Sequence, residues 1–277
     1  MRFARIWPAL LMAASAGPLC LAQEPAAQQP VAKNAPVARS PLVDARCETH
    51  LRKMAEHLKS LKSFSFEAEV LYDEAGDGGQ KLLFGRRISG DLVRPDRAKG
   101  TAHDDQYTKS YWYDGKAVTV LDVDAKTYSR VDAPDTIDAM FDTMATRYAL
   151  VLPFGDLLVS DPLPMLVTNV ESGRYVGMHK IAGVDCHHLA FTQPNVDWQI
   201  WIDGGEHPFP RRLAITYKNA NGSPQYIATF VKWDAAAKFA DDHFKFVAPS
   251  DAQAVEMQPL EEPAGAATDE KTNKEEQ

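Results

Sequence analysis

Cysteine is scarce in this chain of 277 residues, which contains only Cys20, Cys47 and Cys186. Cys20 lies in an apolar N-terminal stretch, so a folded domain that follows has two cysteines. A single possible bridge is no disulfide framework, and a chain of this length can bury a core that needs none. A bridge between Cys47 and Cys186 and two separate buried thiols are both compatible with the sequence.

Long apolar runs are absent as well. The N-terminal "MRFAR" carries two arginines, and the apolar stretch "IWPALLMAASAGPLCLA" that follows is interrupted by two prolines. This stretch is shorter than the roughly 20 residues that a membrane-spanning helix needs, and the residues before its cysteine do not fit a lipoprotein signal. We therefore predict a cleaved signal peptide over residues 1–22 and a periplasmic location.

The sequence also has no excess of basic residues. It contains 30 Lys and Arg against 38 Asp and Glu, a formal net charge of −8. Loss of residues 1–22 removes Arg2 and Arg5, which leaves 28 minus 38, or −10. Because long-range attraction to nucleic acid or to an anionic membrane requires positive charge, we expect no nucleic-acid partner and no stable membrane insertion after cleavage.

Familiar catalytic motifs are missing: the sequence has no nucleophile elbow, no phosphate-binding glycine loop and no paired-histidine zinc helix. The adjacent His187 and His188 lie in a strand pattern and should point to opposite faces, so we expect no shared metal. The loop-like clusters "HDD" at 103–105 and "DDH" at 241–243 could meet as a cation site, which keeps a metal-dependent hydrolase as the least favoured alternative. We assign no catalytic residue, no metal ligand and no cofactor.

What the sequence does contain is one domain between two polar segments. Residues 23–42, rich in Pro, Ala and Gln, predict a disordered linker, and residues 251–277 predict a disordered acidic tail. Within the domain predicted at 43–250, the apolar residues from Cys47 to Leu61 recur at steps of four and three. This spacing predicts a helix from about Asp44 to Lys62.

The remainder of the domain reads mostly as strands. The runs are "FSFEAEVLYD", "KLLFGRRI", "DLVRPDRA", "QYTKSYWY", "KAVTVLD", "KTYSRV", "GRYVGMHKI", "VDCHHLAF", "DWQIWID", "PRRLAITYK", "PQYIATFVKW" and "HFKFV". Their short connections and the Asp-Gly turn in "YDGK" favour antiparallel pairing. About eleven strands are too many for a flat sheet, so we predict an α+β fold with a strongly curved antiparallel half-barrel.

A helical insertion interrupts the strands. Residues 135–148 follow helical spacing, with Asp135 as the capping residue, and Pro-broken apolar segments continue after them. We predict that this lid and the N-terminal helix cover the concave side of the sheet. Methionines in such a loose cover suit variable apolar ligands.

Four stretches carry a resemblance to a known family. "GDLVRPDRAKG", "SYWYDGKAVTVLDVDAKTYSRVD", "GVDCHHLAF" and "DWQIWIDGGEHPFPRRLAITYK" closely resemble domain-of-unknown-function family 2092, periplasmic proteins placed in the LolA-like fold superfamily. The resemblance covers about residues 44–249 and implies a half-barrel with an apolar cavity under its helices. The superfamily includes lipoprotein carriers, a lipoprotein receptor and a stress sensor. The stretch "LVRP" resembles one in the carriers, which implies that Arg94 hydrogen-bonds the lid; otherwise Arg94 is a strand-edge residue before a proline.

The sequence therefore predicts a periplasmic, non-enzymatic carrier or sensor that binds an acyl chain or a lipidated protein. The predicted ligand-binding residues are Met140, Phe141, Met144 and Leu152 on the lid, Trp198 and Ile200 on the sheet, and Arg94. The alternative is a protein–protein interaction module with a packed interior, which would bind another envelope protein.

Overall fold

The computed structural model describes residues 43–76 and 79–260. The predicted signal peptide, the predicted linker at 23–42 and the end of the predicted tail at 261–277 lie outside the described residues. Their predictions therefore stay predictions.

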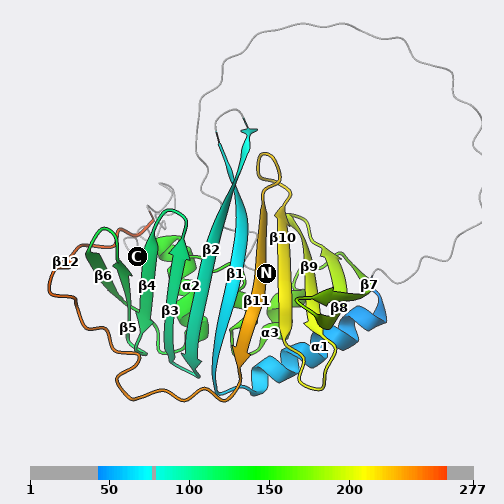
Figure 1. Cartoon of the computed structure of the whole chain (residues 1–277), viewed down its shortest axis with the longest axis horizontal. Helices are drawn as coiled ribbons and strands as arrows, with labels where there is room; N and C mark the ends of the chain where they lie inside the picture. The colour runs from blue at the N-terminus through cyan, green and yellow to red at the C-terminus, as the bar shows by residue number, and fades with distance from the viewer. Residues whose placement is uncertain (1–42, 77–78, 261–277) are drawn as a thin grey trace, which may run out of the picture.

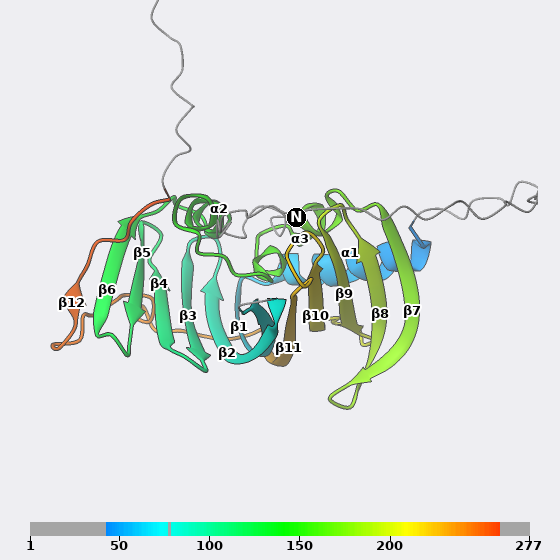
Figure 2. The ribbon, with the colours of Figure 1, turned by 90° about the horizontal axis from the view of Figure 1, so that it is seen from above.

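The described chain folds into one sheet of twelve strands with helices on its concave side (Figures 1 and 2). The strands are β1 (Ser63–Ala75), β2 (Lys81–Val93), β3 (Arg97–Asp104), β4 (Thr108–Tyr113), β5 (Ala117–Asp122), β6 (Thr127–Asp132), β7 (Ser172–Ile181), β8 (Val184–Thr192), β9 (Val196–Asp203), β10 (Pro210–Tyr217), β11 (Gln225–Asp234) and β12 (Gln253–Ala254). The helices are α1 (Ala45–Ser60), α2 (Ile137–Tyr148), the short 3-10 helix η3 (Gly155–Leu157) and α3 (Pro162–Val167). The predicted α+β fold with a strongly curved sheet is confirmed.

The sheet has two limbs, and each is a meander of sequential strands. The strand order is β12-β6-β5-β4-β3-β2-β1-β11-β10-β9-β8-β7. The first limb runs from β1 to β6 and ends with β12, and the second limb contains β7 to β11. Pairing of β1 with β11 joins them. All neighbouring strands are antiparallel except β12, which pairs parallel with β6.

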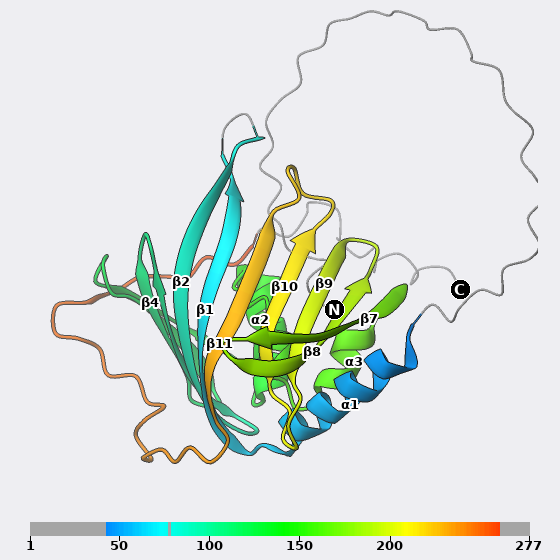
Figure 3. The ribbon, with the colours of Figure 1, turned by 45° about the vertical axis from the view of Figure 1, so that its right-hand side comes forward.

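Helix α1 forms where the apolar spacing predicts it. The side chain of Asp44 accepts a hydrogen bond from the Arg46 backbone N–H and caps the first turn. The apolar stripe is fully buried, and the helix packs against α3, β7 and β9. Figure 3 shows α1 lying across the second limb.

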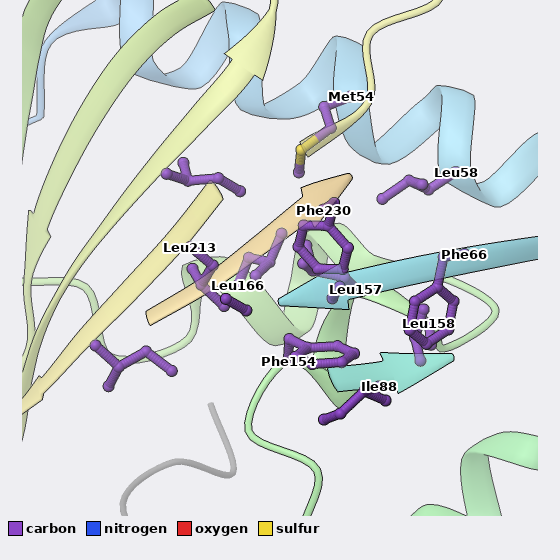
Figure 4. Close-up of a cluster of buried hydrophobic side chains, with 14 of the residues drawn as sticks. Met54, Leu58, Phe66, Ile88, Phe154, Leu157, Leu158, Leu166, Leu213 and Phe230 are labelled. Carbon is purple, nitrogen blue, oxygen red and sulfur yellow. The ribbon is translucent and has the colours of Figure 1, made fainter. Parts of the chain in front are cut away.

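The core lies between this helix and the sheet. Alternate residues of β1, Phe64 to Val70, are buried on the concave face. Figure 4 shows Met54 and Leu58 of α1 pointing toward Phe230 of β11. Burial of each large apolar side chain contributes roughly 1.5 to 3 kcal/mol, so the packing under α1 stabilises the fold strongly.

Two strand predictions are wrong. The run "DLVRPDRA" is not one strand, because β2 ends at Val93 and β3 begins at Arg97. Pro95, which has no N–H to donate to a sheet, lies in the turn between them. The run "HFKFV" forms no strand either. Its Phe246 instead packs against Trp112 and Tyr128, at centroid distances of 5.1 and 5.0 Å.

The fold also continues beyond the predicted boundary at residue 250. The parallel strand β12 belongs to the segment that the sequence predicted as a tail. The backbone N–H of Leu260 then donates to the carbonyl of Arg147, at the end of α2, over 2.6 Å. The C-terminal segment thus reaches from the edge of the first limb to the second helix.

Candidate functional site

The helices cover the two limbs differently. The backbone of α1 lies close to α3, β7 and β9, whereas α2 makes no comparable backbone approach to any element of the described chain. Figure 2 shows α2 over β2 and β3, in the first limb, and α1 over the second limb. This looser approach of α2 to the sheet leaves space beneath it.

That space is a cavity of about 180 Å³ between the first limb and α2. Its lining comes from β1 to β5, from α2 and from the segment that follows α2. The lining residues are Phe66, Arg86, Ile88, Ser89, Gly90, Leu92, Ala98, Lys99, Gly100, Thr101, Ala102, Tyr111, Trp112, Tyr113, Val118, Met140, Phe141, Met144, Leu150, Val151, Leu152 and Leu158.

The floor of the cavity is a patch of sheet with almost no side chains. Ala98, Gly100 and Ala102 alternate along β3 on the concave face, and Gly100 pairs with Gly90 of β2. A Cβ atom at Gly90 would lie 2.4 Å from the Phe66 ring, so that ring covers Gly90. A Cβ atom at Gly100 would approach only the backbone oxygen of its neighbour in β2, at 3.3 Å. The cavity exists because small residues leave the space above Gly100 empty.

The roof is α2 and the loop after it. The helix begins after Thr136, whose hydroxyl accepts from the Ala139 N–H; the predicted capping residue Asp135 lies one position too early. The predicted lid residues all lie in this roof, and all line the cavity: Met140, Phe141, Met144 and Leu152. Their contact with a ligand stays a prediction.

Hydrogen bonds hold α2 near its two ends. At its start, the Ile137 N–H donates to the Pro95 carbonyl over 2.8 Å. The carboxylate of Asp138 accepts from the backbone N–H and the hydroxyl of Ser160, over 2.9 and 2.5 Å. At its end, the Arg147 carbonyl accepts from Leu260. The methionines between these points are held only by packing.

Trp198 and Ile200 do not line the cavity. Both are fully buried in the second limb, where Trp198 stacks on Phe191 at a centroid distance of 4.2 Å. The sequence placed both residues at the ligand, and the structure corrects this: they lie outside the cavity, because α1 and α3 fill the space above these strands. The sheet residues that do line the cavity belong to β1–β5, and the alternating small residues of β3 are the sequence signal that could have identified them.

Arg94 connects helical segments to the sheet without reaching the cavity. Its guanidinium donates to the carbonyls of Leu61 and Leu158 over 3.0 and 2.7 Å, and lies 3.5 Å from that of Leu58. Burial lowers the pKa of Arg94, and the nearby Asp138 opposes this effect. Arg94 thus joins the end of α1 to the turn that supplies Leu158 to the roof. Its role in opening the cavity stays a prediction.

One charged group that sequence reasoning missed lies at an end of the cavity. Arg86 Nε donates to the Asp104 carboxylate over 2.6 Å, and Arg86 Nη2 donates to the hydroxyls of Tyr107 and Tyr72 over 2.8 and 3.3 Å. The Tyr72 hydroxyl in turn donates to Asp104 over 2.8 Å. Burial alone raises the pKa of Asp104, but the hydrogen bonds from Arg86 and Tyr72 outweigh it and hold this pKa below its usual value.

The histidine pair diverges, as its strand position predicts. His187 stacks on His50 of α1 at 3.5 Å, and His188 stacks on Trp201 on the opposite face at 4.0 Å. Between residues 43 and 260, apart from 77 and 78, no group of three or more His, Cys, Asp or Glu side chains could hold a metal ion. The "HDD" and "DDH" clusters therefore form no such group. His243 instead pairs with Asp91 over 2.7 Å.

Cys47 and Cys186 are two separate buried thiols. Cys186 shares its strand face with His188, which is the face opposite His187 and α1. Cys47 lies on the buried side of α1 itself. The sheet therefore separates the two sulfur atoms.

Comparison with known proteins gives a family and several distant structures. Residues 47–258 match the family described as predicted periplasmic protein (DUF2092). The solved structures that resemble the chain include LprF from Mycobacterium bovis, with 14% identity, a TM-score of 0.47, and coverage of 72% of this chain and 98% of LprF. Lipoprotein LppX from Mycobacterium tuberculosis has 14% identity, a TM-score of 0.45, and coverage of 71% and 100%. The LolA superfamily protein NE2245 from Nitrosomonas europaea has 11% identity, a TM-score of 0.37, and coverage of 72% and 97%.

No curated protein matches the chain significantly. In the part of the chain that the structure describes, every helix is too short or too polar to cross a membrane. The family match spans most of the sequence and coincides with the domain built from the two limbs. The chain belongs to the DUF2092 family of predicted periplasmic proteins.

Proposed function

We propose that this protein binds an acyl chain, of a lipid or of a lipidated protein, in the cavity beneath α2, and that it does so in the periplasm as a carrier or sensor. The observation that carries the proposal is the cavity of about 180 Å³ with its mostly apolar lining. An apolar protein cavity of roughly 150 Å³ stays dry and accepts a molecule the size of benzene. The cavity therefore has room for about six carbon atoms of a chain.

The energetics suit reversible binding. Transfer of about six methylene groups from water, at about 0.8 kcal/mol each, contributes about 5 kcal/mol. Association itself costs an estimated 4 kcal/mol or more, so this short stretch alone binds weakly. A longer chain would bind more tightly, and it requires α2 to move outward. The attachment of α2 near its ends and the flexible side chains of Met140 and Met144 are compatible with that movement.

The chemistry of the lining supports binding without catalysis. The residues that line the cavity include no His, Cys, Asp or Glu. Ser89 and Thr101 belong to the lining, but strand alternation directs their side chains to the convex face. General acid–base or nucleophilic catalysis most often uses such groups. The lining also includes Tyr111 and Tyr113, but burial raises the pKa of each to about 12, so both hydroxyls stay protonated at neutral pH.

The packed second limb is the feature that an interaction module would share. Such a module needs no internal cavity, however, whereas the loosely covered first limb contains one. This difference favours the binding function over the interaction module.

The test is lipid retention by the purified protein. The chain is incubated with an envelope lipid extract, purified again, and examined by native mass spectrometry and by thermal melting. We expect bound acyl lipids and a raised Tm for the wild type. Ala102→Leu, which fills the cavity from its floor, should lose the lipid. Thr101→Leu adds similar bulk to the opposite face of the same strand and should retain it.

Absence of bound lipid in the wild type, together with an unchanged Tm, would contradict the proposal. Equal retention by Ala102→Leu and the wild type would show that lipid binds elsewhere.

A further inference from the structure

The lining of the cavity includes a charged residue, Arg86, which binding of a purely apolar chain does not require. Along β2, alternation places Arg86 on the concave face with Ile88, Gly90 and Leu92. The other charged residue of the lining, Lys99, points to the opposite face, where its ammonium lies over the Trp112 ring. Among the lining residues, Arg86 is thus the one charged side chain directed toward the cavity.

The charge of Arg86 is balanced before any ligand arrives. The Asp104 side chain is fully buried beside it, and the Arg86 side chain keeps 21% of its exposure. The low pKa of Asp104 keeps that carboxylate ionised at neutral pH. The pair therefore has no net charge.

The guanidinium nevertheless retains unused donors. The hydrogen bonds to Asp104, Tyr72 and Tyr107 use Nε and Nη2. Within the described residues, Nη1 donates to no acceptor. An arginine with two free N–H groups at the polar end of an apolar cavity can bind the oxygen of a ligand head group.

We propose, on the basis of the acyl-binding function above, that Arg86 selects ligands whose acyl chain ends in an uncharged carbonyl, as in an ester or an amide, over free fatty acid anions. A carbonyl oxygen accepts a charge-assisted hydrogen bond from Nη1 and brings no charge into a partly buried site. A carboxylate must lose more of its hydration there, and the Asp104 carboxylate beside Arg86 repels it.

The placement of Arg86 also orients the ligand. Arg86 lies on β2 nearer the projecting end of the β1–β2 hairpin than Ile88 and Leu92 do (Figure 1). The head group therefore lies toward that end, and the hydrocarbon runs along β2 toward Leu92 and Leu158, beneath Met140. This direction follows from a single cation at one end of an otherwise apolar lining.

The test compares matched ligands on the purified full chain at pH 7.5 by isothermal titration calorimetry. The probes are mono-octanoylglycerol and octanoate, and retention of acyl lipid from the envelope extract, measured by native mass spectrometry, is the reference for binding itself. We expect mono-octanoylglycerol to bind at least about tenfold more tightly than octanoate, because the ester carbonyl accepts the Nη1 hydrogen bond without the loss of hydration and the repulsion by Asp104 that the carboxylate meets. This comparison uses the wild type alone, so it does not depend on any variant folding.

Variants assign the preference to its residues. The double variant Arg86→Met with Asp104→Asn removes both charges and leaves Tyr72 an amide oxygen as acceptor. We expect the preference to fall by about threefold or more, since the ester loses the hydrogen bond from Nη1 and the carboxylate no longer meets the repulsion of Asp104, while the variant still retains acyl lipid from the extract. Arg87→Met removes the neighbouring arginine, which pairs with Glu69 on the convex face, and should keep the full preference.

Octanoate binding as tight as that of mono-octanoylglycerol would overturn the inference, and so would an unchanged preference in the double variant. Lipid retention separates the two proposals. If the protein retains acyl lipid from the extract but the head-group preference is missing, only the role of Arg86 fails; if it retains no acyl lipid and neither probe binds, the acyl-binding function fails with it.

Discussion

Two alanines in one row of the sheet offer a direct test of the cavity. Ala68 of β1 and Ala102 of β3 both pair with Ile88 of β2, and both are buried on the concave face. Ala102 lines the cavity, whereas Ala68 does not and is fully buried in the core. The same change to leucine therefore adds the same atoms to an empty space in one case and to a filled one in the other.

The expected free-energy changes have opposite signs. Leucine at position 102 adds three apolar groups at about 0.8 kcal/mol each, which raises the free energy of unfolding by up to about 2.4 kcal/mol. Leucine at position 68 forces its packed neighbours apart, which typically lowers it by about 1 to 3 kcal/mol. Urea unfolding of both variants and the wild type measures the two changes, provided that the denaturant dependence m stays the same.

The reasoning is refuted if Ala102→Leu destabilises the protein as much as Ala68→Leu. That result would mean that the side chains of α2 already fill the space above β3. Binding of an acyl chain would then lose its structural basis.

Three further predictions concern the parts around the cavity. Arg94→Met should lower the free energy of unfolding by about 1 to 3 kcal/mol in urea titrations, because buried carbonyls lose their donor; no change would contradict the role of Arg94 as a connection between helices and sheet. Burial lowers the pKa of His57 and of His187 below 6.5, so as the pH falls these histidines bind protons at a higher pH in the unfolded chain than in the folded protein. The free energy of unfolding should therefore fall between pH 7.5 and pH 5.5 and fall less in His57→Gln; a pH-independent stability would oppose this. Burial raises the pKa of Cys47 to about 11 and also raises that of Cys186. Both thiols should react with a thiol reagent only after unfolding, and a lack of any reaction then would reveal a disulfide.

The elements that the sequence predicted well are those whose pattern is local. In β9, Trp198, Ile200 and Ile202 alternate with half-buried neighbours because each strand residue points to the face opposite the previous one. The same logic identifies α1 from its apolar stripe. The pattern fails at Pro95, where apolar residues on both sides resemble one strand but belong to two.

The candidate site was predictable only in part, because it depends on contacts between distant segments. The lid residues, such as Met144, stand out by their helical spacing and their side-chain type. Whether a strand faces that lid or the first helix is decided by the pairing of β1 with β11, which no local pattern specifies. This pairing places Trp198 under α1 and Ala102 under α2. The sequence showed the apolar face of the sheet, but not which half of it lies under each helix.

The division between the limbs explains how one small domain can be both stable and hollow. A cavity forfeits packing energy, and the closely packed second limb compensates for it. Arg94 fixes the boundary between the two, since it holds the carbonyls of Leu61 and Leu158 at the end of β2. The proposed binding of a longer chain predicts that outward movement of α2 bends the chain between the Ile137 attachment and Leu158, while α1 and the strands beneath it stay in place. We therefore expect the helix that covers the cavity to open while the core beneath α1 stays packed.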